Sequence, residues 1–161
     1  MTAVFVSNEP FFLLTQERLD EIGALAEQSE LGRARFCLHS SAEDPVQEMI
    51  IAIARRSHFP PHCHPLKAES LHVVSGSLGL VTFDGDGTIT RRVTLSAADL
   101  QAPAFYRIGA GVWHGVFALS ELAVVHEVTA GPFAPDGSRN APWAPQTADE
   151  VARYRRQAIG A

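Results

Sequence analysis

The chain has 161 residues, of which 46% are hydrophobic, and a formal net charge of −5. This length suits one compact domain with a substantial core, and the negative charge argues against a partner such as nucleic acid or an anionic membrane, which binds clustered Lys and Arg. We therefore expect a small-molecule ligand, with no nucleic-acid partner and no membrane partner.

The location of the protein is inferred from its N-terminus and its cysteines. Residues 2–14 contain no Lys or Arg and do not resemble a signal peptide. No apolar run is long enough to span a membrane. The two cysteines, Cys37 and Cys63, are too few for a disulfide framework. We expect a cytoplasmic protein.

The first half of the chain predicts one helix followed by strands. Thr15 can cap a helix that runs to about Ser29, because apolar residues recur there at helical spacing. From Arg33 the hydrophobic period changes to two, as in a half-buried strand. The apolar run Met49–Arg55 predicts a buried strand.

The second half predicts more strands and a second helix. Strands are expected at residues 70–74, 78–83, 88–95, 113–119 and 122–129. The third of these pairs with the second across the turn 84–87, and the last two are expected to form a hairpin across Ser120 and Glu121. A capping box at Thr147–Glu150 opens a short C-terminal helix. Many short strands without βαβ alternation predict an all-β sandwich or closed barrel.

These elements suggest three segments. We expect an N-terminal segment and helix packed on the barrel over residues 1–32, a β-barrel over residues 33–130, and a Pro-rich arm with a short helix over residues 131–161.

Four side chains form a candidate metal site. His62 and His64 are two residues apart and share a face if the backbone is extended. Glu69 can join them from the next strand on the same side of a sheet, and His114 supplies a distant fourth group. Cys63 would point to the opposite face. Three imidazoles and a carboxylate are suitable ligands for one divalent metal ion. This ligand set does not distinguish among Zn, Fe, Mn, Ni, Co and Cu.

Four protein ligands on a six-coordinate metal leave positions open, so the metal could act as a Lewis acid or lower the pKa of bound water. A structural site would more often be closed and tetrahedral. The alternative is a metal-free barrel whose polar residues hydrogen bond to one another. Four buried ionisable groups are costly without a charge partner, which favours the metal.

Other side chains could take part in binding or catalysis, and each also has an ordinary structural interpretation. A carboxylate on the last strand could act as a base or be solvated, cations could hold an anionic substrate or lie on the surface, and aromatic residues could line the cavity or the core. These candidates are Glu127 as the base, Lys67, Arg55 and Arg35 as the anion-binding cations, and Tyr106 and Trp113 as the aromatic residues. His72 and His126 match no motif, and we interpret them as surface or hydrogen-bonded histidines.

Two motifs resemble the cupin superfamily. His62-x-His64, four residues, Glu69, six residues and Gly76 match the His-to-Gly portion of its first motif, and Gly111-x-x-His114 matches the core of its second. The chain departs from the second motif at two positions, with Gly109 in place of the usual Pro and Ala118 in place of the usual Asn. Neither departure removes a ligand.

The wider pattern is similar to the WbuC family of cupin-fold metalloproteins over roughly residues 15–145. It consists of the segments 33–39, 44–49, 60–64, 67–69, 110–114 and 131–133. The resemblance implies a single-domain, RmlC-like jelly-roll cupin barrel with His62, His64, Glu69 and His114 as metal ligands. It also implies a link to polysaccharide gene clusters, and by analogy with other cupins a homodimer.

Three functions are compatible with this set. The first is a metal-dependent enzyme, an isomerase, epimerase or hydrolase, that acts on a small anionic or sugar-derived metabolite. The second is a non-haem Fe(II) dioxygenase that uses the same four ligands. The third is a non-catalytic metal or ligand sensor, and the fold alone does not decide among them.

Overall fold

The computed structural model describes residues 3–7 and 9–159, so the ends of the two expected terminal segments, residues 1–2 and 160–161, lie outside the described residues, as does residue 8. In chain order the elements are β1 (Ala3–Val6), α1 (Gln16–Gln28), β2 (Arg33–Cys37), β3 (Val46–Ala54), β4 (His62–Cys63), β5 (Glu69–Ser75), β6 (Ser77–Phe83), β7 (Ile89–Ser96), β8 (Phe105–Ile108), β9 (Trp113–Ala118), β10 (Leu122–Ala130), β11 (Arg139–Asn140) and α2 (Ala148–Ile159). The prediction of an all-β fold with an N-terminal and a C-terminal helix is confirmed, although one strand that was not expected, β1, precedes α1.

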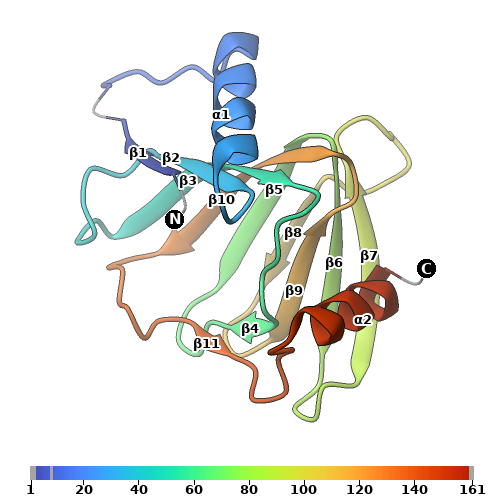
Figure 1. The fold of residues 1–161 in the computed structure, drawn as a ribbon. Coiled ribbons are helices and arrows are strands. Elements are labelled where there is room, and N and C mark those ends of the chain that lie inside the picture. Colours follow the sequence, from blue (N-terminus) through green and yellow to red (C-terminus); the bar gives the residue numbers. More distant parts are fainter. Residues whose placement is uncertain (1–2, 8, 160–161) are drawn as a thin grey trace.

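The strands form two sheets that pack face to face (Figure 1). One sheet has the order β1-β2-β3-β10-β5-β8, and the other has the order β11-β4-β9-β6-β7. A buried core that includes Val73 and Val125 from the first sheet and Leu78 and Leu95 from the second fills the space between them. Within the described residues no strand pairing joins the two sheets, so of the two expected architectures, sandwich and closed barrel, the fold is the sandwich, with jelly-roll topology.

The predicted hairpin across Ser120 and Glu121 is wrong. β9 pairs with β4 and β6 in one sheet, whereas β10 pairs with β3 and β5 in the other. The chain therefore crosses from sheet to sheet at this turn, and it crosses again at Gly76 between β5 and β6. A turn signal shows where the chain reverses, but it does not show which sheet the next strand joins, because that depends on burial against distant strands.

Helix α1 covers the outer face of the first sheet (Figure 1). Thr15 is its N-cap and accepts a hydrogen bond from the backbone N–H of Arg18 at 3.4 Å. Ile22 and Ala26 are fully buried against Ala34 and neighbouring residues of the sheet. The predicted start and end of this helix are confirmed to within one residue.

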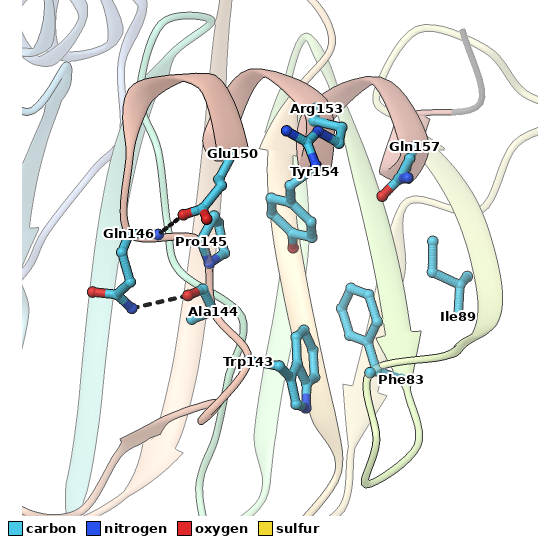
Figure 2. A pocket seen from close by; sticks show the side chains of 11 residues that line it. Phe83, Ile89, Trp143, Ala144, Pro145, Gln146, Glu150, Arg153, Tyr154 and Gln157 are labelled. Atoms are coloured by element: carbon cyan, nitrogen blue, oxygen red, sulfur yellow. Dashed lines mark hydrogen bonds between the residues drawn. The ribbon is translucent and has the colours of Figure 1, made fainter.

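Helix α2 covers the outer face of the second sheet, and its capping box is formed as predicted. The Glu150 carboxylate accepts hydrogen bonds from the backbone N–H groups of Gln146 (2.8 Å, Figure 2) and Thr147 (3.0 Å), and the Thr147 hydroxyl accepts one from the Glu150 N–H (3.3 Å). Tyr154 packs from the helix onto Phe117 of β9. No helix in the described part of the chain is long and apolar enough to cross a membrane.

Gly76 is required at the crossing from β5 to β6. Its φ of +76° lies in the left-handed region, and a Cβ there would meet the carbonyl oxygen of Leu122 and would lie 2.5 Å from Ser120 Oγ. The crossing at Gly76 thus packs directly against the crossing at Ser120–Leu122.

We expect Gly76→Ala to lower the free energy of unfolding by about 2 kcal/mol or more, because backbone strain and a steric clash add together. Urea denaturation of the two proteins measures the change. Gly85→Ala is the matched control, since a Cβ at Gly85 meets nothing within 4 Å, and it should change stability by less than about 0.5 kcal/mol. Equal stability of the two variants would contradict this role of Gly76.

Candidate metal centre

The four predicted ligands converge between the two sheets. His62 in β4 lies directly opposite His114 in β9, both in the second sheet. His64 follows β4, and Glu69 is the first residue of β5 in the first sheet. The expectation that one side of a single sheet would carry the histidines and the glutamate is therefore wrong, because the chain changes sheets between His64 and Glu69.

The ligand atoms of these side chains lie close together. One ring nitrogen from each histidine and one carboxylate oxygen all lie within 4.8 Å of one another. His64 Nε2 is 3.1 Å from Glu69 Oε2, and His114 Nε2 is 3.7 Å from Glu69 Oε1. Glu69 and His114 are buried, with exposed side-chain fractions of 6% and 1%.

Backbone carbonyl groups orient the three imidazole rings. The Nδ1 atoms lie near carbonyl oxygens, for His62 at 2.9 Å from Pro60, for His64 at 3.3 Å from Gly137 and for His114 at 3.0 Å from Val112. A carbonyl oxygen only accepts hydrogen bonds, so each Nδ1 carries a proton. In the neutral rings of His62 and His114 the Nε2 lone pair is then free to bind a metal, which is the arrangement of metal-ligating histidines. His64 Nε2 lies 3.1 Å from the Glu69 carboxylate and carries a proton there, which a bound metal would displace.

Glu69 is ionised despite its burial. Burial alone would raise the pKa of Glu69, but the nearby His114 ring and the hydrogen bonds from His64 and the Tyr106 hydroxyl outweigh it and hold the pKa below its usual range. Tyr106 donates to Glu69 Oε1 at 2.6 Å. Burial and the Glu69 charge raise the pKa of Tyr106, so its hydroxyl stays protonated as a donor.

The pKa values of two of the histidines are shifted in opposite directions. Burial and the neighbouring His114 lower the pKa of His62 to about 4. The hydrogen bond with Glu69 raises the pKa of His64, against the effect of burial.

The residues fit a bound metal ion. Nε2 of His114 is buried and has no hydrogen-bond partner among the described residues, which is costly for a polar atom. A cation between His114, Glu69 and the other two imidazoles would satisfy that nitrogen and offset the negative charge of the carboxylate.

A cavity of about 540 Å³ opens beside His64. Three of the predicted catalytic or substrate-binding residues line it, namely Arg35, Lys67 and Glu127. Its outer wall comes from the Pro-rich arm, including Phe133 and Gly137. A ligand in this cavity would therefore contact one edge of the metal centre.

Glu127 faces this cavity from β10, two cross-strand pairs away from the Thr129–Glu69 pair. Burial and the negative charge of Glu69 raise the pKa of Glu127 to about 8. A carboxyl group in this position can exchange a proton with a ligand in the cavity.

Several candidate residues lie elsewhere. Arg55 is exposed and pairs with Glu121 at 2.9 Å. Trp113 packs in the core cluster beneath α2. His72 is exposed on β5, and His126 pairs with Glu48 at 2.7 Å on the same sheet.

The sequence reasoning missed the groups that orient the rings. The arm carbonyl of Gly137 and the carbonyls of Pro60 and Val112 are backbone groups, so no residue type marks them. The only signal was the high proline content of residues 131–145, which indicates an ordered arm.

A second hollow of about 320 Å³ lies beneath α2 and is separate from the metal centre. Figure 2 shows its aromatic wall of Phe83, Trp143 and Tyr154, with Arg153 and Gln157 at its upper edge. None of the four candidate ligands lines it.

Solved structures with the same fold are similar to this chain at low sequence identity. Protein SO0799 from Shewanella oneidensis is 13% identical, with a TM-score of 0.56 and coverage of 78% of this chain and 81% of that one. Oxalate oxidase in complex with the substrate analogue glycolate is 17% identical, with a TM-score of 0.53 and coverage of 83% and 68%. CapF with an inhibitor is 20% identical, with a TM-score of 0.52, and the match covers 61% of this chain but only 28% of CapF. These similarities show the fold, and with the two sheets described above they confirm the predicted single-domain cupin jelly roll.

No curated protein matches the sequence. A family model described as a domain of unknown function, DUF6016, matches residues 14–95, just over half of the 161-residue chain. That span holds α1, three of the six strands of the first sheet and three of the four candidate ligands. The chain therefore belongs to the DUF6016 family.

Proposed function

We propose that the protein binds one divalent metal ion and is a metal-dependent enzyme that acts on a small anionic or sugar-derived metabolite. The ligands are His62, His64, Glu69 and His114. One observation carries the proposal: each histidine has Nδ1 committed to a backbone carbonyl, and all four side chains place a ligand atom within 4.8 Å of the others.

A metal ion at this site would supply Lewis-acid chemistry and would lower the pKa of bound water. The protein's own groups position the ligands. The carbonyls of Pro60, Gly137 and Val112 hold the rings, and Tyr106 holds one oxygen of Glu69. Glu127 is the residue that exchanges a proton with the metabolite, since it faces the cavity next to His64.

The size of the cavity supports an enzyme or ligand-binding protein over a sensor that binds metal alone. A volume of about 540 Å³ holds a small metabolite and not only water. The similarity of the sequence motifs to the WbuC family adds a role in polysaccharide metabolism to this proposal, and with it a sugar-derived substrate.

We expect the purified protein to contain about one metal ion per chain and His62→Ala to contain far less, because a four-ligand set loses most of its affinity with one ligand removed. Elemental analysis by mass spectrometry gives both values. His72→Ala is the matched control, since His72 is an exposed histidine of β5, and it should keep the wild-type content. Equal, negligible metal in wild type and His62→Ala would end the proposal.

We also expect Tyr106→Phe to remain folded and to bind metal about tenfold or more weakly, because it removes the hydrogen bond that orients Glu69. Competition with a chromophoric chelator measures the affinity, and circular dichroism checks the fold. Unchanged affinity would show that Tyr106 does not position the ligand.

A further inference from the structure

We propose that the cavity beside His64 is an oxyanion-binding site, in which Arg35, assisted by Lys67, holds a carboxylate or phosphate group of the substrate. The inference rests on the proposed function for the metal end of the cavity. It adds the chemical class of the ligand and the residue that selects it.

The backbone places Arg35 on the inner face of the first sheet. In β2, Arg35 and Cys37 share one face, and both line the cavity. Cys37 lies opposite Met49 of β3, and Met49 lies opposite Glu127 of β10. Arg35 Nη1 is 3.7 Å from Met49 Sδ, so the guanidinium group leans along the sheet toward the row that holds Glu127.

The guanidinium group of Arg35 is poorly satisfied by the protein. A thioether sulfur is a weak acceptor, and Nε of Arg35 is buried without a hydrogen-bond partner among the described residues. No carboxylate forms an ion pair with Arg35 or Lys67 in the part of the chain that the structure describes. Donors of this kind are satisfied by a ligand that brings acceptor oxygens.

The charges around the cavity favour an anion. Two permanent cations, Arg35 and Lys67, line it together with one carboxyl group, Glu127. A divalent ion at the neighbouring centre would add positive charge beyond the single charge of Glu69. This positive cavity belongs to a chain whose net charge is −5, so the positive potential is local to the site.

The geometry of the cation indicates which group it takes. A planar guanidinium presents parallel N–H groups that match two oxygens of a carboxylate or a phosphate. The cavity volume of about 540 Å³ fits a small molecule. Its carboxylate or phosphate group would lie near Arg35, and the rest of the molecule would face His64.

The test is calorimetric titration of inorganic phosphate, and separately of malonate, into the protein as purified, with its metal content measured beforehand. We expect at least one of these anions to bind, and Arg35→Gln to weaken its binding about tenfold or more, because the variant loses charge-assisted hydrogen bonds to the anion. Binding of phosphate alone identifies a phosphate ligand, and binding of malonate alone identifies a carboxylate.

Two further variants complete the design. Arg55→Gln is the matched control, because Arg55 lies outside the cavity and pairs with Glu121, and it should bind as wild type does. Lys67→Gln alters a loop residue and should weaken binding about twofold to fivefold. It decides the outcome if circular dichroism shows that Arg35→Gln does not fold.

The inference is overturned if Arg35→Gln, or in its place Lys67→Gln, binds as tightly as wild type, or if neither anion binds with a dissociation constant below about 10 mM. A wild-type protein that contains no metal but binds an anion through Arg35 would contradict the proposed function and still support the oxyanion site.

Discussion

The burial of one carboxylate among three imidazoles is the constraint on which the site depends. Glu69 comes from one sheet, whereas His62 and His114 come from the other, so the four groups meet only while the two sheets stay packed. The hydrophobic core between the sheets supplies that packing. A cation at the centre would in turn join the two sheets through ligand bonds, so we expect metal binding and stability of the sandwich to be coupled.

The groups around the ligands determine what the ligands can do. Three backbone carbonyls accept a hydrogen bond from Nδ1 of each ring and so orient the rings, and Tyr106 holds Glu69. One of these carbonyls, that of Gly137, belongs to the arm that also forms the outer wall of the cavity. The arm thus connects the metal centre to the site where we place the substrate, and a ligand that moved the arm would also move the His64 ring.

The cavity combines two kinds of recognition. It is lined by His64 and Glu127, the proposed metal ligand and proton-transfer group, and by the cations Arg35 and Lys67. An anionic metabolite bound by these cations would be held at a fixed distance from Glu127, as proton transfer requires. The hollow beneath α2 has aromatic walls, and none of the four candidate metal ligands lines it (Figure 2).

The sequence by itself determined the local features: the limits of α1, the capping box of α2, the positions of the longer strands β2, β3, β5, β6, β7, β9 and β10, and the four candidate metal ligands at their motif spacings. These depend on short-range periodicity and capping, which neighbouring residues control. Only the tertiary structure decided that the chain changes sheets at Gly76 and Ser120, that Arg35 faces the cavity while Arg55 does not, and that Gly137 orients His64. Strand partners and backbone acceptors depend on burial against residues far away in the chain, and no local pattern encodes that.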